Sequence, residues 1–128
     1  MKILCDTHVL LWYLQGERQH FSPLTQDVLL DETNELYFST ASMWEIAIKH
    51  SLSKPDFSFE PSMISNELLQ QGFKVLNITL PHVLAVSQLP FIHNDPFDRL
   101  LIVQAEWERL HFFTADSKIL QYNNPLIV

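Results

Sequence analysis

The chain has 128 residues, of which 47% are hydrophobic, a size and composition that fit one domain with a substantial core. A single cysteine and two glycines exclude an intrachain disulfide, a cysteine-based zinc site and a glycine-rich phosphate loop. The formal net charge of -7 argues against a protein that holds nucleic acid by bulk charge, while an enzyme that meets phosphate through bound cations is compatible with it.

Short apolar runs alternate with helical patterns along the first part of the chain. Ser22 and Pro23 are typical of an N-cap and a first helical residue. In chain order we expect a strand at 2–5, an all-apolar helix at 9–14, a helix at 23–33, a strand at 36–39 and a helix at 40–51.

The same alternation continues to the end of the chain, after a proline-containing loop. We expect a helix at 62–71, a strand at 74–78, a short helix at 81–87, a helix at 96–108, a strand at 111–114, a helical turn at 117–120 and a strand at 125–128. This order predicts one α/β domain over residues 1–128 with a mostly parallel sheet flanked by helices.

Two acids lie just beyond the ends of predicted strands. Asp6 comes after the first predicted strand and Asp116 after the strand that ends at Thr114. Taken alone, each is explained equally well as a helix N-cap, where aspartate is favoured.

A third acid, Asp98, is harder to explain as a structural residue. Leu101, Ile102 and Ala105 follow it at helical spacing, so Asp98 shares the inward stripe of an apolar helix. A carboxylate on such a stripe is costly unless something pairs with it, which favours a functional role. Asp95, by contrast, is interpreted as the N-cap of this helix.

Glu45 lies in the helix at 40–51, at the edge of its apolar arc, and an i,i+4 pair with Lys49 is the alternative interpretation. Asp6 and Asp116 are expected in strand-to-helix turns at the edge of the sheet where ligands bind, and Glu45 and Asp98 are expected within the first turns of helices that enter from that edge. Four carboxylates that converge without histidine or cysteine predict a Mg²⁺ or Mn²⁺ site.

Four segments of the chain resemble the PIN-domain ribonucleases, in particular the VapC-type toxins of bacterial toxin–antitoxin pairs. They are residues 3–8 (Ile-Leu-Cys-Asp-Thr-His), 42–49 (Ser-x-x-Glu-Ile-Ala-Ile-Lys), 93–102 (His-Asn-Asp-Pro-Phe-Asp-Arg-Leu-Leu-Ile) and 114–116 (Thr-Ala-Asp). The resemblance implies a sheet of about four to five strands, Mg²⁺- or Mn²⁺-dependent RNA cleavage that leaves a 3′-hydroxyl and a 5′-phosphate, a homodimer, and an antitoxin bound in the active-site groove. Cys5 departs from the aliphatic residue usual before the first acid.

The site expected from residues and resemblance together has graded roles. Asp6 and Asp98 are the strongest candidates for direct metal ligands, and Glu45 and Asp116 complete the cluster. Asp95 is an accessory residue. Thr114 or Ser117 is assigned to the positioning of water or of a ligand carboxylate. Arg99, Lys49 and Lys118 are candidates for a basic rim that binds substrate, although Lys118 is interpreted first as an ordinary surface charge.

Three other functions stay open on the sequence. One is a catalytically silent PIN-like module that binds RNA or protein, another is a receiver-type domain, and the third is a DNA nuclease on the same fold. An acid as early as Asp6 does not suit a signal peptide, and no apolar run is long enough to cross a bilayer. We therefore expect a cytoplasmic protein with no membrane attachment.

Overall fold

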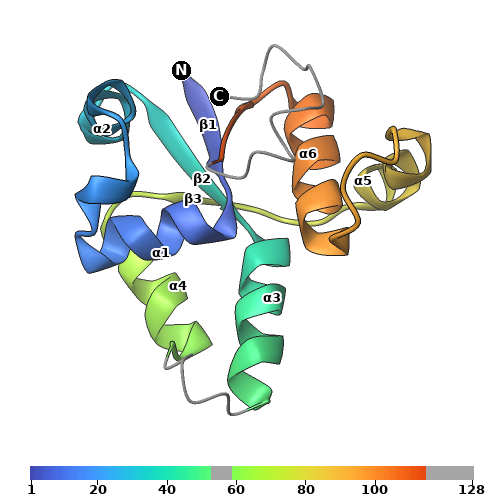
Figure 1. The fold of residues 1–128 in the computed structure, drawn as a ribbon, viewed down its shortest axis with the longest axis horizontal. Coiled ribbons are helices and arrows are strands. Elements are labelled where there is room, and N and C mark those ends of the chain that lie inside the picture. Colours follow the sequence, from blue (N-terminus) through green and yellow to red (C-terminus); the bar gives the residue numbers. More distant parts are fainter. Residues whose placement is uncertain (53–58, 115–128) are drawn as a thin grey trace.

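The computed structural model describes residues 1–52 and 59–114, which form a parallel sheet with helices packed on both of its faces (Figure 1). The strands are β1 (Lys2–Cys5), β2 (Glu35–Ser39), β3 (Lys74–Leu76) and β4 (His111–Phe113). The helices are α1 (Thr7–Gln15), α2 (Pro23–Leu30), α3 (Thr40–Ser51), α4 (Pro61–Gln70), α5 (Leu80–Ala85) and α6 (Pro96–Glu108), with short 3-10 helices η1 (Arg18–His20) and η2 (Val86–Gln88). The predicted α/β class is confirmed.

The order of the strands puts β1 at the point where the chain changes direction across the sheet. The sheet order is β3-β2-β1-β4 and all three strand pairs are parallel. The chain runs outward from β1 through β2 to β3 and then returns to place β4 on the other side of β1. In open α/β sheets, ligands bind at the carboxyl ends of the strands beside such a reversal.

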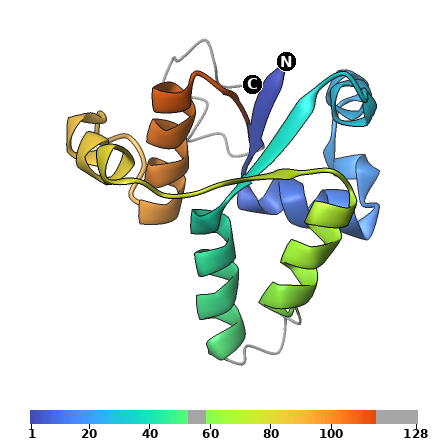
Figure 2. The ribbon, with the colours of Figure 1, turned by 180° about the vertical axis from the view of Figure 1, so that it is seen from behind.

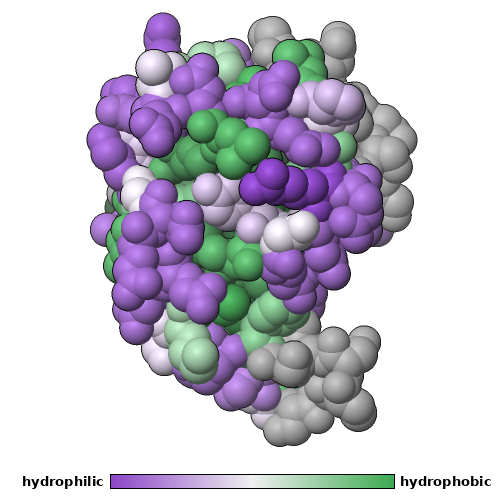
Figure 3. All heavy atoms as spheres, turned by 90° about the vertical axis from the view of Figure 1, so that its left-hand side faces the viewer, coloured by the Kyte–Doolittle hydropathy of each residue, from purple (hydrophilic) through white to green (hydrophobic). Residues whose placement is uncertain are grey.

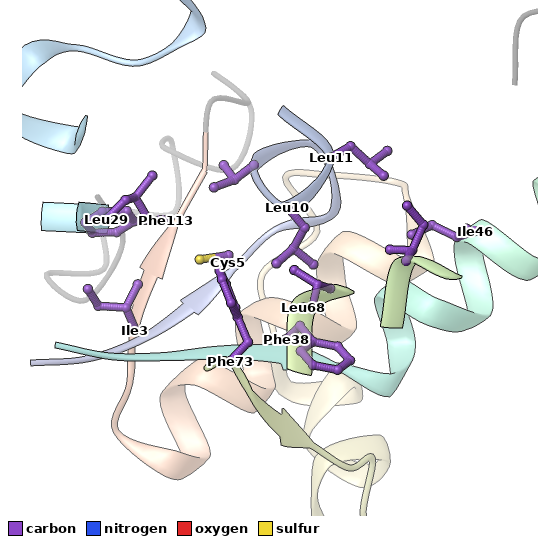
Figure 4. Close-up of a cluster of buried hydrophobic side chains, with 12 residues drawn as sticks. Ile3, Cys5, Leu10, Leu11, Leu29, Phe38, Ile46, Leu68, Phe73 and Phe113 are labelled. Atoms are coloured by element: carbon purple, nitrogen blue, oxygen red, sulfur yellow. The ribbon is translucent and has the colours of Figure 1, made fainter. Parts of the chain in front are cut away.

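Each face of the sheet has its own apolar core. Ile3 and Cys5 of β1 point to the face covered by α1, α2 and α4, while Leu4 points to the face covered by α6. Figure 4 shows the first core, where Leu10 of α1 and Leu68 of α4 meet over the strands. Burial on both faces explains the continuous apolar run Ile3–Leu4–Cys5 of β1.

The helix that begins at Pro23 ends three residues earlier than predicted. Its predicted cap is confirmed, because Ser22 Oγ accepts from the Thr25 N–H at 3.1 Å. At the other end, Asp31 Oδ1 accepts from both the N–H and the hydroxyl of Thr33, at 2.9 and 2.7 Å. Such an Asp-centred turn competes with another helical turn, and α2 stops at Leu30.

The chain after β3 also differs from the prediction. A strand was expected to residue 78, but the Ile78 N–H donates to Thr40 Oγ1 at 3.1 Å instead of continuing the sheet ladder. The helix expected at 81–87 is divided into α5 and η2, and η1 was not predicted. The turn and strand expected at 117–120 and 125–128 lie outside the described residues.

Two helices, α3 and α4, extend together beyond one end of the sheet, as Figure 2 shows from behind. On the side that carries α1 and α2, apolar surface is exposed in patches separated by polar side chains (Figure 3). Within residues 1–52 and 59–114, no helix is both long and apolar enough to cross a membrane.

Candidate active site

Asp6 occupies the turn between β1 and α1, where the strand order reverses. Its carboxylate is almost fully buried, and Oδ1 caps α1 by accepting from the Val9 N–H at 2.9 Å. The Asp6 N–H donates to the Phe113 carbonyl at 3.0 Å, which ties the ends of β1 and β4 together. The predicted cap is therefore real, and it fixes the acid at the ligand-binding edge of the sheet.

Burial, reinforced by the Asp6 charge, raises the pKa of the neighbouring Cys5 thiol, so this cysteine is a core residue and not a nucleophile.

Glu45 is held from two sides. Its Oε1 accepts from the Thr7 hydroxyl at 2.8 Å, and the Ser42 hydroxyl lies 3.0 Å from that of Thr7. Its Oε2 lies 3.2 Å from Lys49 Nζ, so the predicted i,i+4 pair is present. However, the Glu45 side chain is only 10% exposed, far more buried than a surface ion pair. It is the sixth residue of α3 and lies in the second turn, whereas the first turn was expected.

Asp98 is the third residue of α6 and lies half-buried below the cap supplied by Asp95. Its Oδ2 is 2.8 Å from His93 Nε2. The pKa of Asp98 is raised to about 7, first by burial and then by the negative charges of Asp95, Asp6 and Glu45, with His93 acting in the opposite direction. Raised values of this kind are typical of carboxylates that share a site without a counter-charge.

The three described acids thus share one electrostatic neighbourhood without forming a closed ligand set. In the described part of the chain, no three His, Cys, Asp or Glu side chains lie together in a group that could hold a metal ion. The fourth predicted acid, Asp116, lies outside the described residues. The chemistry of the donors nevertheless fits a hard divalent cation, because Asp6, Glu45 and Asp98 offer carboxylate oxygens and the charges of Asp6 and Glu45 act on Asp98.

The accessory residues have different outcomes. Asp95 caps α6, as predicted, by accepting from the N–H groups of Phe97 and Asp98 at 2.9 and 3.1 Å. Thr114 is half-buried directly after β4, at the same edge as Asp6. Ser117 and Lys118 lie outside the described residues.

Arg99 differs from its prediction as a cation of an exposed rim. Only 7% of the residue is exposed, and its guanidinium donates to the backbone carbonyls of Val86, Leu89, Pro90 and His93 at 3.2–3.4 Å. Arg99 is the first of seven consecutive buried residues of α6, so its side chain lies inside the protein and not on the surface. Arg99 therefore fastens the segment that carries His93 to α6, and Lys49 is the described cation beside the acids.

We expect Arg99→Met to lower the free energy of unfolding by about 3 kcal/mol or more, because buried carbonyls lose charged donors and stay away from water. Urea unfolding followed by circular dichroism measures the change. Arg18→Met is the matched control, since Arg18 is exposed on η1 and its loss should change stability by less than about 0.5 kcal/mol. Equal stability of the two variants would contradict a structural role for Arg99.

No role was predicted for three residues that hold the acids in place. His93 contacts Asp98, the Thr7 hydroxyl contacts Glu45, and the Ser42 hydroxyl contacts that of Thr7. All three lie in the segments that carry the family resemblance, and Ser42 precedes Glu45 by one helical turn. Only the spacing of Ser42 was a usable signal, because the contacts of Thr7 depend on how α1 and α3 pack, and that of His93 depends on the path of the loop before α6.

Comparison with known proteins agrees with this fold. The family model of the PIN domain matches residues 3–124, and the chain belongs to that family. It is similar to a chain in the crystal structure of VapBC2 from Rickettsia felis bound to a DNA fragment from their promoter, with 12% identity, a TM-score of 0.72, and coverage of 100% of this chain and 98% of that chain. It is also similar to a chain of VapBC-1 from nontypeable Haemophilus influenzae, with 16% identity, a TM-score of 0.64, and coverage of 95% and 92%. A search of curated protein sequences found no significant match. Membership of the PIN family makes the receiver-domain alternative wrong.

Proposed function

We propose that the chain is a metal-dependent endoribonuclease and the toxin of a toxin–antitoxin pair. The observation that carries this proposal is the group of acids around Asp98 in a PIN fold: burial raises the pKa of this carboxyl most, and the charges of Asp95, Asp6 and Glu45 raise it further. An acid with only a structural role is destabilised by negatively charged neighbours, so their presence favours a functional role for Asp98.

In this proposal Asp6 and Asp98 hold the metal directly, and Glu45 and Asp116 complete the set. When bound, Mg²⁺ or Mn²⁺ supplies neutralisation of phosphate charge and activation of water for in-line attack on phosphorus. The protein's own contribution is orientation: Thr7 and Lys49 fix the two oxygens of Glu45, and His93 fixes one oxygen of Asp98. Thr114 and Ser117 are assigned to the positioning of water or of a ligand carboxylate.

The proposed partners are an antitoxin and a second copy of the chain. Both structural relatives named above are parts of VapBC complexes, which supports an antitoxin. A stripe along α3 and its C-cap residue at i, i+4 and i+8 supports self-association, because Trp44, Ile48 and Leu52 are 55%, 38% and 60% exposed. The proposed location is the cytoplasm, where RNA and antitoxin are made.

Incubation of the purified protein with end-labelled single-stranded RNA and Mn²⁺ tests the activity. We expect internal cleavage that leaves 5′-phosphate and 3′-hydroxyl ends, and a loss of at least about a hundredfold in Asp6→Asn, since even outer-shell changes cost metal sites about 10- to 100-fold. Asp27→Asn, the same change on an exposed position of α2, should keep full activity.

Each remaining alternative predicts a different result in this assay. Binding of RNA without cleavage in Mn²⁺ would favour the silent PIN-like module, and preferential cleavage of single-stranded DNA would favour the DNA nuclease. Full activity in Asp6→Asn would reject the carboxylate site itself.

A further inference from the structure

A hollow of about 310 Å³ lies between α1 and α3. Its wall includes Thr7, His8 and Trp12 from α1 and Lys49 from α3. This volume is at the lower end of pockets that take small organic ligands, and it suits one nucleotide-sized group better than a large cofactor.

The hollow adjoins the proposed active site through shared residues. Thr7 follows Asp6 directly and donates to Glu45 Oε1 at 2.8 Å, while Lys49 Nζ lies 3.2 Å from Glu45 Oε2. A group bound in the hollow therefore contacts residues that adjoin Asp6 and Glu45. A substrate strand that runs from the acids toward α1 and α3 places a neighbouring unit at this hollow.

Its aromatic wall is held in place from behind. The Trp12 indole stacks on His20 with ring centroids 4.1 Å apart and an angle of 13°, and Phe21 packs against it edge-on at 6.0 Å. On the side of the hollow, His8 lies 5.8 Å from Trp12 and is exposed. Fixed aromatic and imidazole rings are the surfaces on which unpaired bases stack.

The hollow also carries a positive charge, which a phosphate group can contact. Lys49 provides the cation of a wall that mixes aromatic rings and apolar side chains with the polar side chains of Thr7 and Gln15, and the Lys49 side chain is 38% exposed. A nucleotide uses both features, since its base meets the rings and its phosphate meets the ammonium group. An apolar ligand leaves Lys49 unused, and a free anion leaves the rings unused.

We propose that this hollow binds one nucleotide of the single-stranded substrate beside the bond that is cut, with its base against Trp12 and His8 and a phosphate toward Lys49. This assignment rests on the proposed nuclease function and names a subsite for its substrate. Residue Trp12 then belongs to substrate binding, while the acids carry the reaction.

A titration followed by nuclear magnetic resonance tests binding apart from activity. The chain has three tryptophans, so the ¹⁵N-labelled protein gives three indole N–H signals, and Trp12→Phe identifies the one from Trp12. In EDTA, addition of the four 5′-mononucleotides in turn should shift the Trp12 signal more than that of Trp107, which is 58% exposed on α6. Inorganic phosphate should shift it less than the mononucleotides do.

Kinetics on single-stranded RNA provide the second measurement. We expect Trp12→Ala and His8→Ala to raise KM about tenfold or more, with kcat changed by less than about twofold, and Trp12→Phe to restore part of the loss. Trp107→Ala is the matched control and should keep both constants. His8 is exposed, so its substitution tests the subsite even where Trp12→Ala fails to fold.

The outcomes separate the subsite from the proposed function. A Trp12 response to mononucleotides in a protein without nuclease activity supports the subsite and contradicts the function. Metal-dependent cleavage with equal KM in Trp12→Ala, His8→Ala and Trp107→Ala overturns the subsite and leaves the function standing. A Trp12 signal that responds to an antitoxin peptide and to no mononucleotide also overturns it.

Discussion

Asp98→Asn is expected to abolish RNA cleavage and, at neutral pH without metal, to make the protein more stable than the wild type. The two effects share one cause. Asp98 is half-buried among the charges of Asp95, Asp6 and Glu45, which favours its protonated form in the folded state. Asparagine keeps the shape of the side chain and removes the charge that folding has to accommodate.

The sign of the pH dependence follows from the raised pKa. The folded state holds the Asp98 proton up to about pH 7, while the unfolded chain, with an ordinary value of 3.8, releases it earlier. Stability is therefore unaffected at about pH 3, falls as the pH rises from about 4 to 7, and stays low above that range. The full loss is on the order of 3 kcal/mol, because one pKa unit corresponds to about 1.4 kcal/mol and other groups share part of the shift.

Urea unfolding of the wild type and Asp98→Asn in EDTA measures this difference. The two curves should nearly coincide at about pH 4 and separate by about pH 8, with the variant more stable. Asp27→Asn, on exposed α2, should follow the wild type at both values. A variant that is less stable than the wild type at high pH would show that another group already neutralises Asp98.

The sequence predicted several helix and strand ends that are determined by residues next to them in the chain. The first strand and the caps Ser22 and Asp95 were located correctly, because a strand buried on both faces is a continuous apolar run and capping residues act on their own helix. The ends of α2 and β3 were wrong where a competing contact decides them. For β3 that contact is the hydroxyl of Thr40, which is distant in sequence and carries no local signal.

The unusual position of Asp98 was predictable, whereas the contacts of its neighbour Arg99 were not. Asp98 was singled out because a charged residue shared a stripe with core residues, and its raised pKa gives that pattern a physical meaning. Arg99, the next residue, was expected on a rim because arginine is usually exposed. Its burial is favoured by four carbonyl acceptors presented by residues 86–93, a segment whose path depends on tertiary packing.

Addition of Mg²⁺ or Mn²⁺ is expected to raise the melting temperature of the wild type, since a ligand that binds only the folded state stabilises it. At about a hundredfold excess over Kd the gain is about 2.7 kcal/mol, on the order of 10 °C for a domain of this size. EDTA should reverse the shift and stop RNA cleavage together, and Zn²⁺ should not be the preferred ion. Asp98→Asn should lose most of the shift, and Asp27→Asn should keep it.

Cation binding should also weaken as the pH falls below about 7, because the folded protein then holds a proton on Asp98 that the cation has to displace. With one proton displaced, the apparent affinity falls about tenfold for each pH unit below that point and levels off above it. Thermal shifts titrated with Mn²⁺ at several pH values measure this slope without relying on catalysis. An affinity that is independent of pH between about 5 and 7 would place the cation away from Asp98, and an unchanged melting temperature with undiminished cleavage in EDTA would reject metal dependence altogether.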